Sequence, residues 1–346
     1  MATVVVKLGG AAITDKATPD SLSASLDTLV DKIALVYQTR LRPHGKKLVL
    51  IHGAGSFGHP PAKKFRVKTG WLTTRDPTAA AATEQCQCAR EVDVHVDGEA
   101  EHQGQLMQQQ QQQQKQREEE QEEQERDRVK FGMALTRQRV LQLHHHVLQR
   151  LQDRVQLPVL SVSTYDTVET SHGQLTSDSS ARLVSRVHKL LAHGFIPLLL
   201  GDAVLDLAWG STILSGDALM HTLATELHRV HRCVFVTDVA GIYTRDPKHF
   251  DDATLIPELR CGSGPDPGLP HDGDVSASLV DDVTGSMGSK WQWVKRIMAD
   301  APQVRCVIIC RAADADDALA LSGDDGVDGG DGGCGDDTRR WTSIVR

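Results

Sequence analysis

A glycine-rich stretch, "HGAGSFGH" at residues 52–59, follows the apolar run "KLVLI". Three glycines and a serine lie between its two histidines. Successive backbone N–H groups in such a loop can surround an anion, because glycine lets the main chain approach closely. The stretch is not a Walker A loop, since no "GK[ST]" closes it. It therefore predicts an anion-binding loop of a different kind.

Three further motifs combine glycine with charged residues. "KLGGAAITDK" and "DVTGSMGSK" place lysines near glycines, and "SGDALMHTLATEL" starts a predicted helix with an aspartate. The residues concerned are Lys7, Gly9, Gly10, Lys16, Asp217, Gly285, Gly288 and Lys290. Each motif alone has a simpler explanation: a turn, a solvated lysine, or an acid at the positive end of a helix dipole. Together they favour phosphoryl transfer, whose catalysis is mostly positioning and neutralisation of charge on the transferring oxygens.

Strands and helices must bring these motifs together. Short apolar, β-branched runs recur at residues 3–8, 47–52, 157–163, 195–201, 233–239 and 304–310. Near-continuous hydrophobicity over so few residues is typical of strands buried on both faces. A last strand is expected in "TRRWTSIV", at an edge of the sheet.

Helical patterns lie between the apolar runs. Apolar residues recur three or four positions apart from Leu22 to Val36 and from Leu219 to Leu227, which places them on one stripe of a helix. Strands alternating with helices predict an α/β fold with a mostly parallel sheet covered on both sides. Ligands of such folds bind beyond the carboxyl ends of the strands, where the glycine-rich motifs lie.

The composition narrows the class of protein. The chain of 346 residues has a formal charge of −8 and no long block of Lys and Arg, so neither nucleic acid nor an anionic membrane is an expected partner. It has no run of about 18 apolar residues and begins with a predicted strand, which favours a cytoplasmic protein. The seven cysteines are irregularly spaced and are expected to be free thiols. "HHH" at 144–146 is expected on a solvated helix face, and no motif predicts a metal held by the protein.

Residues from about 98 to 128 contain a glutamine run and "KQREEEQEEQERDR", with almost no apolar content. Such a segment cannot bury enough surface to offset the entropy of ordering. We expect an insertion that is disordered or forms a fraying, solvated helix. Glycine, proline and aspartate predict loops at 261–274 and 323–337.

Six motifs, in their order along the chain, resemble the amino acid kinase superfamily and, within it, the isopentenyl phosphate kinases. They are "VVVKLGGAAITDK", "LVLIHGAGSFGHP", "PLLLGD", "ILSGDALM", "TDVAGIYTRDPK" and "DVTGSMGSK". "GSFGH" is the most discriminating, whereas "KLGG" and the "TDVAGIYTRDP" pattern are shared across the superfamily. The resemblance covers roughly residues 1–75, 131–260 and 275–346.

The resemblance implies a single domain over residues 1–346, an open αβα sandwich with a mostly parallel central sheet. Residues from about 1 to 200 would bind the acceptor and those from about 201 to 346 would bind ATP, with Mg²⁺ accompanying the nucleotide. The implied reaction transfers the γ-phosphoryl group of ATP to isopentenyl monophosphate, a step of isoprenoid precursor synthesis in the mevalonate pathway. A homodimer is expected by the same analogy.

The resemblance also implies roles for individual residues. Lys7 and Lys290 would flank the transferring phosphoryl group, Asp217 would orient the lysines, and Lys16 would contact ATP phosphates. The residues implied in catalysis are Lys7, Lys16, His59, Asp217 and Lys290. Those implied in ATP binding are Lys7, Gly9, Gly10, Lys16, Gly55, Asp238, Tyr243, Asp246, Pro247, Lys248, Gly285 and Lys290.

By the same resemblance, the loop at 52–59 would hold the phosphate of the acceptor. The implied substrate-binding residues are Ala54, Gly55, Gly58, His59 and Gly201. His59 would donate to non-bridging oxygens, and it can carry charge near neutral pH when an anion raises its pKa. His52, which is still on the strand, is expected to be packed or hydrogen-bonded instead.

One departure and several alternatives remain at this point. The family pattern near Lys290 is usually "TGGM", and Ser286 stands where the second glycine would be, which can restrict a positive φ. A fosfomycin-kinase-like enzyme has a closely related pocket, whereas glutamate 5-kinase would have no use for a histidine that grips phosphate. A non-catalytic nucleotide-binding sensor is the third alternative. The joint presence of Lys7, Lys16, Asp217 and Lys290 argues against it.

Overall fold

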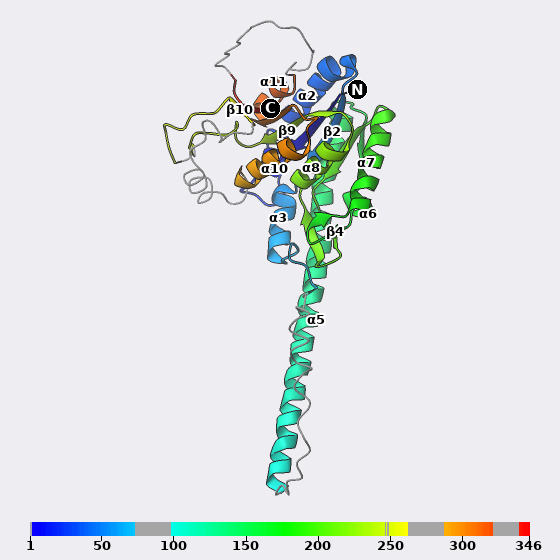
Figure 1. Ribbon diagram of the computed structural model, residues 1–346, viewed down its shortest axis with the longest axis vertical. Coiled ribbons are helices and arrows are strands. Elements are labelled where there is room, and N and C mark those ends of the chain that lie inside the picture. Colours follow the sequence, from blue (N-terminus) through cyan, green and yellow to red (C-terminus); the bar gives the residue numbers. More distant parts are fainter. Residues whose placement is uncertain (1, 73–97, 246, 248, 262–286, 321–338) are drawn as a thin grey trace.

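The structure is a computed structural model that describes residues 2–72, 98–245, 247, 249–261, 287–320 and 339–346, without the side chains of 98–105 and 287–289. The loops predicted at 261–274 and 323–337 lie outside the described residues, apart from Cys261. The body of the described chain is a layered α/β unit, and one long helix projects from it (Figure 1).

The centre of the fold is an eight-stranded sheet. Its strands are, in order across the sheet, β10 (Glu258–Arg260), β12 (Thr342–Val345), β11 (Cys306–Arg311), β9 (Val230–Thr237), β1 (Thr3–Leu8), β2 (Lys47–His52), β6 (Ile196–Leu200) and β3 (Val159–Ser161). β12 is antiparallel to β11, and the other neighbouring pairs are parallel. All six apolar runs therefore form strands of this sheet, as predicted. The prediction that the last strand lies at an edge is wrong, because the short β10 pairs along its outer side.

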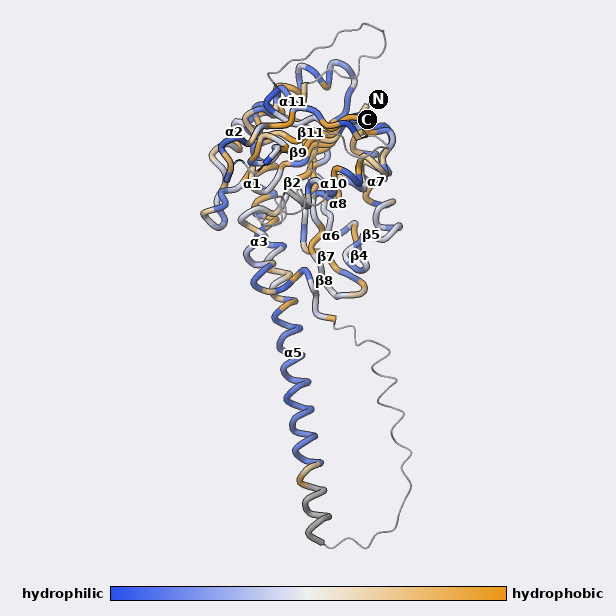
Figure 2. The backbone as a smooth tube through the Cα atoms, turned by 60° about the vertical axis from the view of Figure 1, so that its left-hand side comes forward, coloured by the Kyte–Doolittle hydropathy of each residue, from blue (hydrophilic) through white to orange (hydrophobic). Residues whose placement is uncertain are grey.

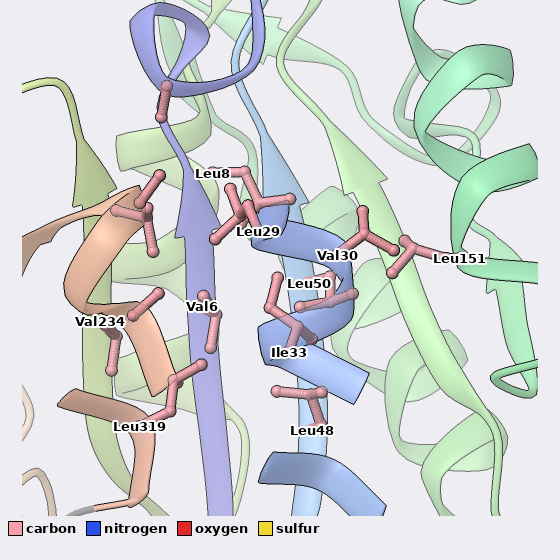
Figure 3. Packing of buried hydrophobic residues seen from close by; sticks show 14 of the residues in the cluster. Val6, Leu8, Leu29, Val30, Ile33, Leu48, Leu50, Leu151, Val234 and Leu319 are labelled. Carbon is pink, nitrogen blue, oxygen red and sulfur yellow. The ribbon is translucent and has the colours of Figure 1, made fainter. Parts of the chain in front are cut away.

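Helices cover both faces of the sheet. One face packs against α2 (Leu26–Val36), the end of α5 (Gly98–Gln149) and α11 (Ala315–Ala320), and the other against α7 (Ser177–Ala192), α8 (Gly216–Glu226) and α10 (Met287–Asp300). Along β1 the side chains alternate between these layers, as the pleat requires: Val4 and Val6 face the first, and Val5 faces the second. Figure 3 shows Val6 packed beside Leu29 and Ile33 of α2. The predicted open αβα sandwich is confirmed.

The remaining elements are short. They are the helices α1 (Gly10–Ile13), α3 (Gly55–Lys64) and α6 (Thr164–Thr167), the π turns η1 (Tyr37–Leu41) and η4 (Arg150–Arg154), and the 3-10 turns η2 (Arg42–His44) and η5 (Ala312–Asp314). A second sheet, which the sequence analysis did not predict, contains β5 (Gln174–Leu175), β4 (Thr170–Ser171), β7 (Asp202–Asp206) and β8 (Gly210–Leu214). β7 follows β6 directly, so this sheet lies beside the carboxyl end of the central one.

Two predicted element boundaries differ from the structure. α2 begins at Leu26 and not at Leu22, because Leu22 forms a bridge with Thr14. The glycine-rich stretch is only partly a loop, since α3 begins at Gly55 and continues through Pro60 and Pro61. A helix N-terminus in that position still presents backbone N–H groups, so the anion-binding prediction keeps its physical basis.

Residues 98–128 form the first part of α5, a helix of 52 residues. The described side chains from Leu106 to Arg128 are all exposed, and burial begins at Val129. Figure 1 shows this part as a rod that leaves the body of the protein, and Figure 2 shows that its coloured residues are mostly hydrophilic. It corresponds to the solvated-helix alternative. No described helix is both long and apolar enough to cross a membrane.

Candidate active site

A pocket of about 550 Å³ lies beyond the carboxyl ends of β1, β2 and β6. Its walls combine residues from all the motifs that were predicted to carry the chemistry. The predicted site residues that line it are Lys7, Gly9, Gly10, Lys16, Ala54, Gly55, Gly58, His59, Gly201, Asp217 and Lys290. The fold thus brings together residues from almost the whole length of the chain, and it does so at the edge of the sheet where α/β proteins bind ligands.

Lys7 and Asp217 form a largely buried ion pair in the pocket wall. Lys7 comes from β1 and Asp217 from the first turn of α8, and Lys7 Nζ lies 2.5 Å from Asp217 Oδ1. Ser215 begins α8 as its N-cap, accepting a hydrogen bond from the N–H of Ala218. This N-cap fixes the first turn of α8 and with it the position of Asp217. Asp217 in turn holds the ammonium group of Lys7 at the pocket wall.

Lys290 approaches the same region from α10. Its side chain is buried, and burial together with repulsion from Lys7 lowers the pKa of Lys290 to about 8, although Asp217 attracts the charge. Two lysines close enough to disturb each other form a site of excess positive charge. An anion placed between them would relieve this repulsion, which is the arrangement that a transferring phosphoryl group needs.

Lys16 forms a second ion pair, at the more exposed rim. Its Nζ lies 2.6 Å from Asp238 Oδ2, and Asp238 follows β9. Burial opposes ionisation of Asp238, but the hydrogen bond and charge of Lys16 hold the pKa of Asp238 below its ordinary value. Asp238 itself does not line the pocket; it positions a lysine that does.

Two glycines let the loops after β1 and β2 touch. A Cβ on Gly10 would lie 2.6 Å from the Cα of Gly55, where there is no room for it. Gly55 has a φ of +52°, and a Cβ there would lie 2.4 Å from the Oγ1 of Thr14. These positions need glycine both for space and, at Gly55, for its backbone conformation. The two loops can consequently pack directly against each other in the pocket wall.

His59 lies on the α3 side of the pocket. His59 is exposed overall, but desolvation of its ring by the neighbouring protein, and then the positive charge of Lys7, lower the pKa of His59 from its ordinary value. Both effects disfavour the charged ring before a ligand binds. A phosphate dianion would reverse the electrostatic contribution and favour the protonated ring.

His52 is fully buried and does not line the pocket, so the prediction that it is packed or hydrogen-bonded is confirmed. Its ring bonds to His144, the first residue of "HHH". The expectation that this run lies on a solvated helix face is wrong for His144, which is buried, although His145 is exposed. Three successive residues of a helix point in different directions, and α5 turns the first of them toward the sheet.

Several pocket residues were not predicted. Thr14 Oγ1 accepts a hydrogen bond from the N–H of Ser56 at 3.0 Å and so joins the two glycine loops. Asp202 is buried, pairs with Arg137 of α5, and accepts from the N–H of Ala203 at 2.8 Å. "PLLLGD" contained the signal for Asp202. Nothing in the sequence linked it to Arg137, which is distant in the chain.

The structure does not bring every predicted ATP-binding residue to the pocket. Tyr243 pairs with Leu255 in an isolated bridge, and Pro247 is exposed; neither lines the pocket. The predictions for Asp246, Lys248 and Gly285, and the question raised by Ser286, lie outside the described residues.

No metal-binding cluster occurs among the residues that the structure describes: nowhere do three or more His, Cys, Asp or Glu side chains gather to hold an ion. The two carboxylates nearest the lysines, Asp217 and Asp238, are each paired with a lysine.

Comparisons with known proteins give a consistent result. A model of the amino acid kinase family matches residues 2–310. The isopentenyl phosphate kinase of Arabidopsis thaliana is 31% identical over 288 residues, which cover 80% of this chain and 68% of the relative. The isopentenyl phosphate kinase of Methanothermobacter thermautotrophicus is 27% identical over 289 residues, covering 83% of this chain and 84% of the relative.

Solved structures show the same architecture. An X-ray structure of isopentenyl phosphate kinase superposes with a TM-score of 0.61 at 21% identity, covering 99% of this chain and 100% of its own. A product complex of the isopentenyl phosphate kinase of T. acidophilum gives a TM-score of 0.60 at 17% identity, covering 99% of both chains. With the match over residues 2–310, these findings show that the chain belongs to the amino acid kinase family.

Proposed function

We propose that this protein transfers the γ-phosphoryl group of ATP to isopentenyl monophosphate and forms isopentenyl diphosphate. The observation that carries the proposal is the composition of one pocket. Its charged end contains Lys7, Lys16 and Lys290 among glycine loops, and its other wall includes the apolar side chains of Val140 and Ile213. Such a pocket suits an acceptor that has a phosphate head and a short hydrocarbon tail. The named relatives of the chain support the same substrate.

Each charged residue has a distinct part in this reaction. An oxygen of the acceptor phosphate attacks the γ-phosphorus of ATP while the bond to the oxygen of the ADP leaving group breaks. Lys7 and Lys290 neutralise the charge that spreads over the transferring oxygens, and Asp217 orients Lys7. Lys16 contacts the ATP phosphates, together with the backbone of Gly9 and Gly10.

The acceptor phosphate lies against the start of α3. The N–H groups of Ala54 and Gly55 donate to it, and His59 takes up a proton and donates from its ring. In the described part of the chain no carbonyl accepts hydrogen bonds from the N–H groups of Ala54 and Gly55, so both can serve a ligand. ATP would occupy the half of the sheet that includes β9, toward Asp238.

Mg²⁺ would enter with ATP and neutralise part of the triphosphate charge. This fits a pocket whose two lining carboxylates, Asp202 and Asp217, are already paired with Arg137 and Lys7. The cytoplasmic location, the homodimer and the assignment of the two halves of the chain to acceptor and nucleotide remain predictions of the sequence analysis.

A panel of acceptors incubated with ATP and Mg²⁺ tests the proposal. We expect ADP formation with isopentenyl monophosphate and at most trace activity with fosfomycin or glutamate. Preferential turnover of fosfomycin would assign the pocket to the related kinase class. ATP binding without turnover of any acceptor would favour the non-catalytic sensor.

A further inference from the structure

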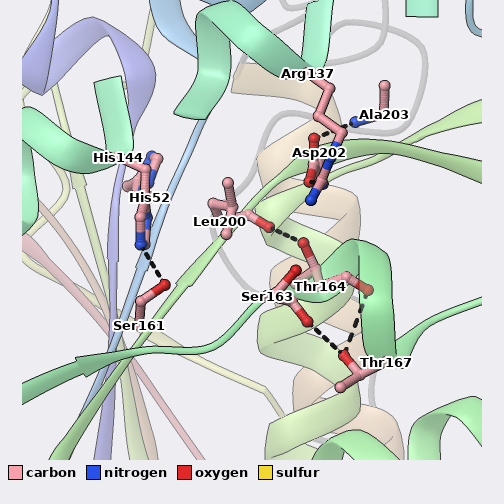
Figure 4. A network of polar contacts seen from close by, with 10 residues as sticks. All are labelled: His52, Arg137, His144, Ser161, Ser163, Thr164, Thr167, Leu200, Asp202 and Ala203. Carbon is pink, nitrogen blue, oxygen red and sulfur yellow. Dashed lines mark hydrogen bonds and ion pairs between the residues drawn. The ribbon is translucent and has the colours of Figure 1, made fainter. Parts of the chain in front are cut away.

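Three polar side chains form a continuous chain of hydrogen bonds beside the loop from Gly53 to His59, here called the phosphate loop. His52, at the end of β2, is fully buried, and its Nε2 lies 2.8 Å from Nδ1 of His144. His144 Nε2 lies 2.7 Å from the hydroxyl of Ser161 at the end of β3. At the other end, His52 Nδ1 lies 3.0 Å from the carbonyl oxygen of Gly53. In Figure 4 the rings of His52 and His144 overlap in the view, and a dashed line joins them to Ser161.

Only one donor-to-acceptor direction along this hydrogen-bond chain satisfies every hydrogen bond. The Gly53 carbonyl can only accept, so His52 Nδ1 carries a proton. Burial lowers the pKa of His52 to about 4 and that of His144 to about 3, so each ring holds a single proton near pH 7. His52 Nε2 must then accept from His144 Nδ1, and His144 Nε2 must accept from the hydroxyl of Ser161. All donors point toward Gly53.

Gly53 is the residue at which β2 passes into the phosphate loop. Its N–H donates to the carbonyl of Leu8 at 3.0 Å, and its carbonyl accepts from His52. Both polar groups of its backbone are therefore fixed. The Gly53 carbonyl and the N–H of Ala54 belong to one planar trans peptide unit, so the two groups point in opposite directions. The following unit carries the N–H of Gly55. Fixing Gly53 thus sets the direction in which these two donors point.

We propose that His52 and His144 are positioning residues for phosphoryl transfer, which hold the Gly53 carbonyl so that the loop donors face the acceptor phosphate. This inference rests on the proposed function, because it concerns the acceptor end of the same pocket. Neither ring touches the pocket itself.

Packing alone gives no reason for two imidazoles here. His144 lies on the buried stripe of α5 between Leu143 and Val147, where a leucine would fill the space without polar atoms to satisfy. Buried polar groups cost free energy unless each one is paired, and here each one is. The arrangement provides a fixed orientation for one carbonyl, which a leucine cannot provide.

Substitutions of His144 separate positioning from packing. His144→Leu keeps the volume and removes the bond to His52, whereas His144→Asn places an amide N–H close to where Nδ1 lies and can restore it. We expect His144→Leu to weaken binding of isopentenyl monophosphate about fivefold to tenfold, the equivalent of one hydrogen bond, while the KM for ATP changes little. His144→Asn should recover most of that loss.

The measurement is the Kd of isopentenyl monophosphate by calorimetry without ATP, with the thermal midpoint of each variant measured in parallel. Val147→Ala, on the same buried stripe, is the matched control that lowers stability without touching the hydrogen-bond chain. Nitrogen NMR of the imidazole rings should show Nδ1–H tautomers for both His52 and His144.

Three outcomes would overturn the inference. One is an unchanged Kd in His144→Leu at a lowered thermal midpoint, the behaviour expected of Val147→Ala. Another is a loss in His144→Asn as large as in His144→Leu, and the third is a different tautomer in either ring. If the wild-type protein fails to bind isopentenyl monophosphate at all, the proposed function fails and this inference fails with it, which the wild-type titration shows before any variant is compared.

Discussion

At the scale of single residues, Lys290 reports most directly on the charge in the pocket. Its pKa of about 8 arises from burial and from repulsion by Lys7, so the free protein loses this charge above about pH 8. We expect kcat/KM for ATP to decline above that pH, since this ratio reports the protonation state of the free enzyme. In Lys290→Arg, whose charge persists to much higher pH, the decline should move upward.

Removing the charge altogether should act on the rate. Lys290→Met is expected to lower kcat by about 100-fold or more, because one preorganised donor at a developing charge contributes on this scale. The KM for ATP should change far less. A Lys290→Met enzyme with near-normal kcat would exclude this lysine from the mechanism.

Asp202 should make stability depend on pH. Burial raises the pKa of Asp202 to about 6, above its value in the unfolded chain, although Arg137 opposes the shift. The folded state therefore binds the proton more tightly, and the resulting stabilisation is complete below about pH 4 and is lost as the pH rises through 6. Relative to Asp202→Asn, the wild type should lose about 3 kcal/mol of unfolding free energy between pH 3 and 7. Urea unfolding at several pH values checks this, and parallel pH profiles of the two proteins would contradict it.

At the scale of elements, α5 combines two parts with different physical roles. From Val129 onward it packs on the sheet, and before that its described side chains are exposed. Deleting residues 106–126 should therefore leave the thermal midpoint nearly unchanged. Leu143→Ala, a fully buried residue of the same helix, should cost about 2–5 kcal/mol. A drop of many degrees on deletion would show that the exposed part stabilises the fold.

The strands of the central sheet could be predicted because their signal is local. β1 and β2 begin and end at the residues predicted from their apolar runs. The small second sheet was missed because β4 and β5 have two residues each and only pair once the chain has folded back. α3 was missed because "GSFGHPP" has low helix propensity, and packing against α5 stabilises it as a helix.

At the scale of the whole molecule, the pocket joins Lys7 near one end of the chain to Lys290 near the other. The motifs identified these residues because phosphate chemistry requires lysine and glycine, and the parallel sheet placed them at one edge. Two other pairs beside the pocket could not be predicted. The pairs of Asp202 with Arg137 and of His52 with His144 join distant segments whose alignment depends on how α5 crosses the sheet.

The account depends most on the loop from Gly53 to His59 as the grip on the acceptor phosphate, and initial-rate kinetics of His59→Ala with each substrate varied in turn tests it most directly. A charge-assisted hydrogen bond contributes about 1.5–3 kcal/mol, so kcat/KM for isopentenyl monophosphate should fall by roughly tenfold to a hundredfold. The KM for ATP should stay nearly constant, and His59→Gln, which keeps a neutral donor, should be intermediate. An unaltered kcat/KM for isopentenyl monophosphate, or an equal loss for both substrates, would contradict the assignment of this loop.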